Sequence, residues 1–252
     1  RQDVNAGMAS SWFSRVFERR PKQRPLSVDA PLAIIGDLHG RADLLEKMLA
    51  RLADDAPDAQ LIFVGDYVDR GPESAAVLER VMSLPDAICL MGNHERMLLD
   101  FLEDPAGKKE GGQRARWLRH GGRETLASFG IHDGEPTEQR DAFLSAMGPE
   151  TVDWLASRPL FFKSGTLYVT HASADPALPI EEQNETTLLW GHPDFGRKLR
   201  KDGHWVVHGH TIVPSPVVHR GCISIDTGAF ATDRLSAAVI SGEELTFLEV
   251  ST

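Results

Sequence analysis

Short apolar runs alternate with longer amphipathic segments in the N-terminal part of the chain. Residues 31–35, 60–64 and 87–91 are apolar over about five positions each, which is typical of buried strands. Between them, residues 43–52 and 73–84 carry apolar side chains at every third or fourth position, as amphipathic helices do. This order predicts a βαβαβ unit, and therefore parallel strands joined by crossover helices.

A helical pattern then continues from residue 95 to residue 158. Gly121 and Gly122 interrupt it. The expected helices lie near residues 98–102, 117–129 and 152–155. We expect this block to form a cap, or one wall, beside the strand ends. Because insertions vary more freely than the scaffold, such a block can set the choice of ligand.

Strand patterns return after Pro159. They lie at residues 167–170, 205–207, 223–225, 237–240 and 245–250, and the last two read as a hairpin around Ser241 and Gly242. The elements alone predict an α/β fold with a mainly parallel beginning. We divide the chain into a leader, residues 1–28, expected to be flexible, and a single domain, residues 29–252, that contains all the predicted strands. We expect residues 1–7, which precede Met8, to be a leftover of recombinant expression, and they take no part in the prediction.

Composition narrows the class of protein. The 252 residues are 41% hydrophobic and 25% charged, which is ordinary for a globular domain, and the net charge of -10 disfavours binding to a nucleic-acid backbone. Cys89 and Cys222 stand in apolar runs, so we expect buried free thiols and a reducing, cytoplasmic location. No stretch has the roughly 20 apolar residues of a membrane span, and stable membrane insertion is not expected.

Metal-binding residue types follow five of the predicted strands. The segments are GDLHG (36–40), GDYVDRG (65–71), GNHE (92–95), THA (170–172) and HGHT (208–211). The carboxyl ends of strands are where open α/β sheets bind ligands. Carboxylate, carboxamide and imidazole groups without a thiol favour divalent Mn, Fe or Zn, and two such ions can clamp a phosphate and generate hydroxide.

The unbroken motifs GDxHG, GDxVDRG and GNHE, followed by separated histidines, resemble the calcineurin-like metallophosphoesterases. Within them, the chain is most similar to the phosphoprotein phosphatase branch and its small bacterial and phage Ser/Thr protein phosphatases. The resemblance continues through HGHT and IDTGA (225–229) and covers residues 32 to about 248. It implies a four-layer sandwich, in which two central β-sheets are flanked by helices.

The resemblance also implies two divalent metal ions, with manganese as the first choice and iron or zinc as alternatives. Asp37 and His39 would hold the first ion, Asp66 would bridge both, and Asn93, His171 and His210 would complete the second. The family position is the histidine directly before threonine, so His208 is expected in the strand or behind the ligands.

Three further residues would act on the substrate. His94 resembles the family's general acid, Asp69 would orient its imidazole and raise its pKa, and Arg70 would clamp the phosphate. The implied reaction is a direct attack on phosphorus by a metal-bridging hydroxide. No phosphoenzyme is expected, because the set contains no serine or cysteine nucleophile.

One position departs from the family. A second arginine usually follows the THA histidine in a Trp-x-Arg segment, but this chain has Trp190-Gly191-His192. An imidazole cannot replace a bidentate guanidinium, so phosphate binding should be weaker or altered in preference unless Arg197 reaches the site. Arg41 lies near the first motif and receives no role.

The sequence therefore predicts a hydrolase of phosphate esters, first of all a bacterial Ser/Thr or dual-specificity protein phosphatase. Its partners would be a phosphorylated protein, a phosphopeptide or a small phosphoester, and the oligomeric state stays open. A diadenosine tetraphosphate hydrolase shares the motifs and is the main alternative, and a non-catalytic metal-binding scaffold is a third. A nuclease is disfavoured by Ile212, where a Gly-His-x-His motif would place a histidine, and a P-loop enzyme by the missing phosphate loop.

Overall fold

The computed structural model describes residues 22–104, 112–132 and 134–252. Residues 1–21 of the expected leader lie outside the described residues. The same holds for residues 105–111 and for residue 133.

The first of two five-stranded sheets carries the predicted βαβαβ unit. Its strands run in the order β10-β9-β1-β2-β3. Their bounds are Leu32–Ile35 for β1, Gln60–Phe63 for β2, Ile88–Cys89 for β3, Arg234–Ser241 for β9 and Glu244–Ser251 for β10. β1, β2 and β3 are parallel, whereas β9 is antiparallel to β1 and pairs with β10 as the predicted hairpin.

The second sheet has the order β4-β5-β6-β8-β7. Its strands are Phe161–Ser164 (β4), Leu167–Thr170 (β5), Trp205–His208 (β6), Val217–His219 (β7) and Cys222–Ser224 (β8). β5, β6 and β8 are parallel, and the two outer strands are antiparallel to their neighbours. The polar segments that follow β5 and β6 therefore emerge at one edge of this sheet.

The two sheets pack face to face, and alternation along the strands explains how. In β1, Leu32 and Ile34 join a buried cluster with Val169 and Val207 of the second sheet. Ala33 and Ile35 belong to the buried cluster under the helices, because successive side chains of a strand point to opposite faces of the sheet. The outer face of the second sheet packs on the segment with η2 (Ile180–Glu182) and α8 (Glu185–Trp190). The predicted four-layer architecture is confirmed.

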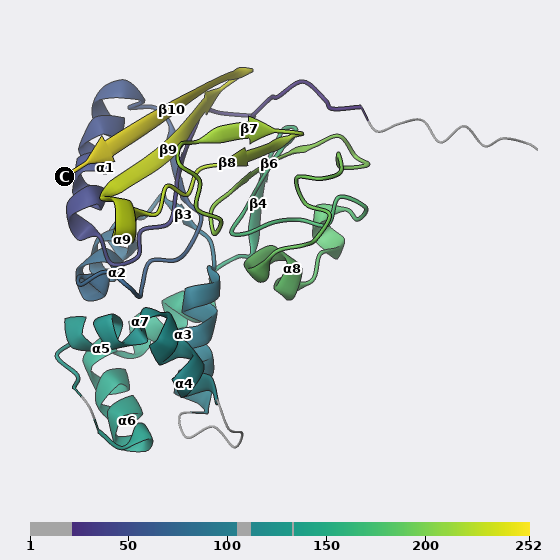
Figure 1. Cartoon of the computed structure of the whole chain (residues 1–252). Coiled ribbons are helices and arrows are strands. Elements are labelled where there is room, and N and C mark those ends of the chain that lie inside the picture. The colour runs from purple at the N-terminus through teal and green to yellow at the C-terminus, as the bar shows by residue number, and fades with distance from the viewer. Residues whose placement is uncertain (1–21, 105–111, 133) are drawn as a thin grey trace, which may run out of the picture.

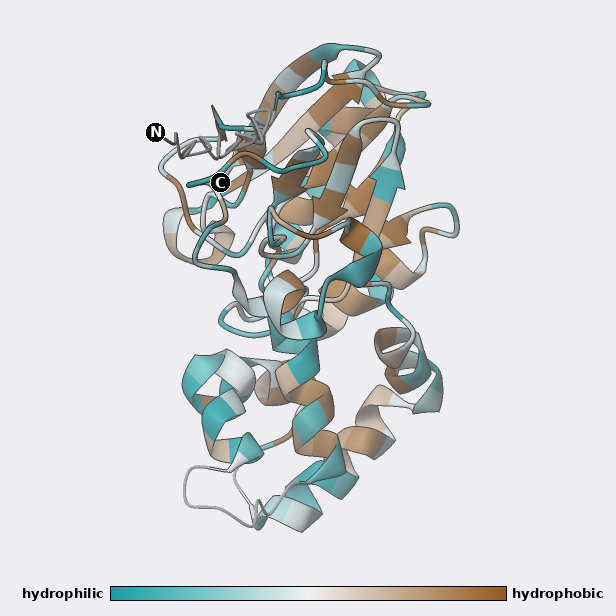
Figure 2. Ribbon diagram, turned by 90° about the vertical axis from the view of Figure 1, so that its right-hand side faces the viewer, coloured by the Kyte–Doolittle hydropathy of each residue, from teal (hydrophilic) through white to brown (hydrophobic). Residues whose placement is uncertain are grey.

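The helices form two groups (Figure 1). α1 (Ala42–Asp55) and α2 (Ser74–Met82) cover the first sheet, and the short α9 (Ala229–Thr232) precedes β9. The other group, here called the helical lobe, projects from the strand ends and comprises α3 (Asn93–Glu103), α4 (Gln113–Trp117), the π-helical turn η1 (Leu118–Gly122), α5 (Arg123–Ser128), α6 (Pro136–Met147) and α7 (Pro149–Ala156). Figure 2 shows brown strands packed inside the sandwich and helices of mixed hydropathy in the lobe.

Four of the elements that the sequence did not predict were missed for identifiable reasons. β4 contains two adjacent phenylalanines rather than an alternating pattern, and β7 is a three-residue edge strand whose residues are all exposed. α6 buries Phe143, Met147 and the polar Gln139, too few apolar positions to show a period. α8 is only six residues long and is held by the Asn184 cap, whose side chain accepts from the backbone of Thr187.

The last residues of the expected leader that are described lie against the second sheet. The backbone N–H of Thr166 donates to the carbonyl of Ser27, and the N–H of Ser27 donates to the Thr166 hydroxyl. The Trp205 indole donates to the carbonyl of Arg24 at 2.8 Å. Both cysteines are buried free thiols, as predicted. Among the described residues, no helix has both the length and the apolar character needed to cross a membrane.

Candidate metal and phosphate site

The predicted strand-end segments converge where the sandwich meets the helical lobe. Five of their non-glycine residues adopt positive φ angles, which such residues seldom do: His39 at 44°, Asp66 at 55°, Asp69 at 72°, Arg70 at 70° and His210 at 62°. Backbone conformations of this kind cost free energy and persist where surrounding contacts hold them. Their concentration on predicted site residues marks this edge as the functional one.

Glu95 holds one of these segments in shape. Its buried carboxylate accepts hydrogen bonds from the backbone N–H groups of Asp66 and Tyr67, both at 2.8 Å, and of Gly92 at 3.0 Å. Val68 donates a further, longer bond at 3.3 Å. The last residue of the GNHE motif thus fixes the loop that presents Asp66.

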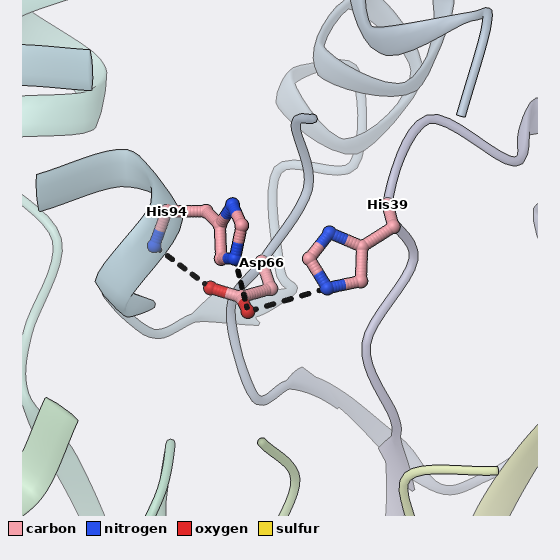
Figure 3. Close-up of side chains that lie close together, drawn as sticks. All are labelled: His39, Asp66 and His94. Carbon is pink, nitrogen blue, oxygen red and sulfur yellow. Dashed lines mark hydrogen bonds and ion pairs between the residues drawn. The ribbon is translucent and has the colours of Figure 1, made fainter. Parts of the chain in front are cut away.

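The Asp66 carboxylate lies between imidazoles from separate elements. Its Oδ2 is 3.4 Å from Nε2 of His39 and 3.9 Å from Nε2 of His94, and its Oδ1 is 3.4 Å from Nε2 of His171 (Figure 3 shows the first two). Two sets of three residues each bring their potential ligand atoms within 4.8 Å of one another. One set is Asp66 with His39 and His94, and the other is Asp66 with His171 and His210. Asp66 is therefore the residue that the two sets share.

Backbone carbonyls orient two of these imidazoles. Nδ1 of His39 lies 2.9 Å from the carbonyl of Val68, and Nδ1 of His171 lies 3.0 Å from that of Val64, so the protons belong on Nδ1. The unprotonated Nε2 atoms then face the Asp66 oxygens. Burial reinforces this state, since it lowers the pKa of His171 to about 3 and also lowers that of His39. Lone pairs that face one another at these distances repel unless a cation lies between them, so the donor set fits divalent metal ions.

Asn93 and His210 extend the set on one side. The side-chain oxygen of Asn93 lies 2.8 Å from Nε2 of His171 and 2.8 Å from Nδ1 of His210. Asp37 stands next to them, because both of its oxygens accept from the backbone N–H of His210. It belongs to neither of the two tight ligand groups found among the described residues. Burial and the carboxylates of Asp226 and Asp66 raise its pKa, as expected for acids gathered around a cation site.

His94 is oriented by a buried network that the helical lobe completes. Nδ1 of His94 lies 2.6 Å from Oδ2 of Asp69. The Trp117 indole donates to both oxygens of Asp69, at 2.9 and 3.0 Å, and the Thr125 hydroxyl donates at 2.7 Å. Asp69 is fully buried. The carboxylate therefore has its acceptor positions filled and holds the ring of His94 in one orientation.

The pKa of His94 shifts in the direction opposite to the sequence-based expectation, because burial disfavours the charged imidazolium. Burial lowers the pKa of His94 to about 4, although the Asp66 carboxylate raises it, and burial also raises the pKa of Asp69 to about 8. Because the two groups share a hydrogen bond, they titrate as one unit. When that unit carries two protons, one is shared between Nδ1 and Asp69 and the other lies on Nε2, toward the predicted metal side.

Arg70 spans the mouth of the site. Its two terminal nitrogens lie 3.1 Å from Nε2 of His39 and 3.1 Å from Nε2 of His94. The guanidinium rests 4.6 Å above the Phe230 ring, and the backbone N–H of Arg70 donates to the carbonyl of Gly121. A planar cation in this position can donate two hydrogen bonds to one phosphate.

Four other residues discussed from the sequence lie outside the ligand groups. His208 is buried, with Nδ1 near its neighbour's carbonyl and Nε2 2.8 Å from the Ser224 hydroxyl. His192 lies 3.6 Å from Asp175 and lines a cavity of about 350 Å³ with His210. The backbone carbonyl of Arg197 accepts from Arg220, and Arg41 holds Asp43 and Asp233 in ion pairs. Arg41 thus ties α1 to the turn after α9.

Sequence reasoning missed four residues of this neighbourhood: Glu95, Trp117, Thr125 and Asp226. Glu95 stood inside a quoted motif, and Asp226 inside IDTGA, so their positions were a usable signal. Trp117 and Thr125 lie 48 and 56 residues from Asp69, and no local pattern connects them to it.

Comparison with known proteins agrees with this geometry. The sequence model of the calcineurin-like phosphoesterase family matches residues 30–214. An asymmetrical bis(5'-nucleosyl)-tetraphosphatase PrpE from Halalkalibacterium halodurans is 30% identical over 81% of this chain and 87% of its own length. Serine/threonine-protein phosphatase 2 of Escherichia coli is 28% identical over 81% of this chain and 89% of its own.

A solved structure shares the fold. The crystal structure of a protein assigned as a diadenosine tetraphosphatase has a TM-score of 0.63 and 20% identity, over 91% of this chain and 97% of that one.

Proposed function

Because the chain belongs to the calcineurin-like phosphoesterase family, we propose that it is a cytoplasmic, metal-dependent protein phosphatase that removes phosphate from serine or threonine side chains. The family makes it a hydrolase of phosphate esters. The observation that carries the proposal is the Asp66 carboxylate, with unprotonated imidazole nitrogens on both sides and the His94–Asp69 pair beside it.

We assign the metal ligands as predicted from the sequence. Asp37, His39 and Asp66 would hold one ion, and Asp66, Asn93, His171 and His210 the other. Two divalent ions, most simply manganese, would supply positive charge for the phosphoryl oxygens and activate the attacking water. The Nδ1–carbonyl hydrogen bonds of His39 and His171 keep their Nε2 atoms free for this purpose.

The chain's own residues complete the reaction. Arg70 would leave its contacts with the two imidazoles and donate to phosphate oxygens, which frees Nε2 of His94. His94 would then give the Nε2 proton to the departing alkoxide, and Asp69 would keep the imidazole oriented through its hydrogen bond with Nδ1. Trp117 and Thr125 hold Asp69 in place, so the imidazole needs little reorganisation during proton transfer.

Hydrolysis of dinucleoside polyphosphates is the second candidate. The relative PrpE is named as an asymmetrical bis(5'-nucleosyl)-tetraphosphatase. The site also has room on two sides: a cavity of about 350 Å³ beside His210 and Trp190, and one of about 380 Å³ beside Arg70 and Phe230. A substrate that extends in both directions from its reacting phosphate fits this arrangement, whether it is a peptide or a dinucleotide.

A substrate panel separates the candidates. The metal-free protein is supplied with Mn²⁺ and given a phosphoserine peptide, a phosphotyrosine peptide, diadenosine tetraphosphate and p-nitrophenyl phosphate, with His94→Asn as the control variant. Turnover of the phosphoserine peptide that depends on Mn²⁺ and is lost in the variant supports the protein phosphatase. Turnover confined to the dinucleotide assigns the second candidate. Bound Mn²⁺ without any turnover would leave only the non-catalytic scaffold.

A further inference from the structure

Arg116 of the helical lobe reaches across to the sandwich at the edge of the site. Its guanidinium carbon lies 4.3 Å from the centre of the Trp190 ring, at the end of α8. That ring stands edge-on to the imidazole of His210, with 6.4 Å between centres. Arg116 therefore lies on the His210 side of the site, whereas Arg70 lies on the His39 and His94 side.

Neighbouring contacts hold Arg116 in this position. Trp117, the next residue of α4, is buried with its indole on Asp69, which fixes the rotation of the helix. A second contact joins the lobe to α8, because Arg96 of α3 pairs with Glu185 at 2.7 Å. The placement of Arg116 therefore follows from the same packing that orders the predicted acid.

The guanidinium keeps its capacity to bind an anion. An arginine that lies on an aromatic face retains its N–H donors for oxygen acceptors, and the indole shields it on one side from water. Asp100 is an acid with which Arg116 interacts electrostatically. His192, two residues after Trp190, lies 3.6 Å from Asp175. This part of the site therefore has an imidazole near a carboxylate, and an arginine would bind a phosphate better there.

We propose that Arg116 is the second cation that binds the substrate phosphate, opposite Arg70, with Trp190 as its platform. The inference deepens the proposed function and rests on it. It identifies the ligand by chemistry, as a phosphoryl group with two anionic oxygens, and gives the helical lobe a direct part in substrate binding.

Binding of inorganic phosphate tests the proposal without turnover. Isothermal titration calorimetry is performed on the Mn²⁺-loaded protein, so a protein that hydrolyses none of the tested esters still gives a result. Arg116→Ala should raise the Kd of phosphate roughly tenfold or more, as for the loss of a hydrogen bond between charged groups. Arg116→Lys should keep part of the affinity, since the charge remains. Arg114→Ala is the matched control: Arg114 lies on the same helix but bonds Gln139.

A rescue experiment sharpens the test. His192→Arg, introduced into Arg116→Ala, should restore phosphate affinity, because His192 lines the cavity that contains His210 and Trp190. Arg116→Gln, with its melting temperature, guards against a folding defect of the alanine variant. Unchanged phosphate affinity in folded Arg116→Ala or Arg116→Gln would overturn the proposal, and so would an equal loss in Arg114→Ala.

Discussion

The indole of Trp117 donates hydrogen bonds to both carboxylate oxygens of Asp69, at 2.9 and 3.0 Å. Asp69 in turn lies 2.6 Å from Nδ1 of His94. Trp117 of α4 thereby controls the orientation of the predicted acid at the beginning of α3. The lobe is therefore part of the chemical machinery as well as a wall of the site.

Trp117→Phe isolates this hydrogen bond, because phenylalanine keeps the stacking between Phe101 and Phe143. We expect kcat to fall roughly tenfold, with about 1–3 kcal/mol lost in stability, since Asp69 would keep a buried oxygen with fewer donors. Steady-state kinetics and urea unfolding measure the two effects. Trp154→Phe is the control, because Trp154 belongs to the same lobe but packs on Tyr67 and Arg158. Equal losses in both variants would contradict a specific role for the Trp117 donor.

Glu95→Gln should weaken metal binding without touching a predicted ligand. The amide would place an NH₂ group against the backbone donors of Asp66, Tyr67 or Gly92, which now meet carboxylate oxygens. We expect the loop to shift, a loss of about 1–3 kcal/mol in stability and a weaker Kd for Mn²⁺ by calorimetry. Glu103→Gln, at the exposed end of α3, serves for comparison. Wild-type Mn²⁺ affinity in Glu95→Gln would show that the loop keeps its shape without this carboxylate.

His94→Asn should spare metal binding and slow the chemistry in proportion to the basicity of the leaving group. A positioned general acid contributes ~10²–10⁴-fold, and a good leaving group needs it least. We expect a small effect on p-nitrophenyl phosphate and a large one on phenyl phosphate, with unchanged Mn²⁺ affinity. If both substrates lose the same factor, or if the metal is lost too, then His94 acts as a ligand rather than as the acid.

Removal of metal should lower the melting temperature, because facing lone pairs around Asp66 then lack a cation. Excess Mn²⁺ at 100 times its Kd should restore about 2.7 kcal/mol of stability. Asp66→Asn should abolish that Mn²⁺-dependent gain, whereas Asp86→Asn, in the exposed turn before β3, should retain it. A Mn²⁺-induced shift of equal size in Asp66→Asn would place the stabilising ion elsewhere.

Local patterns predicted the parts of the fold that local physics controls. The parallel strands and their glycine-rich ends could be read directly, because strand alternation and polar strand-end residues are visible within a few positions. Asp69 could be named from its motif, but its partners Trp117 and Thr125 could not, since they meet it only after the lobe folds back. The direction of the His94 pKa shift was missed for the same reason: burial is a property of the packed lobe.

Gly121→Ala should damage the phosphate clamp through the backbone. Gly121 has a φ of 108°, and an added Cβ would lie 2.4 Å from the backbone nitrogen of Arg70. Either the π-helical turn or Arg70 must move, so we expect a higher KM for phosphate esters together with a loss of stability. Gly130→Ala is the matched control, because Gly130 also has positive φ, at 74°, but its Cβ would meet nothing within 4 Å. The control should lose about 1 kcal/mol from backbone strain alone and keep its KM. If Gly121→Ala binds substrate as well as Gly130→Ala does, the turn does not position Arg70.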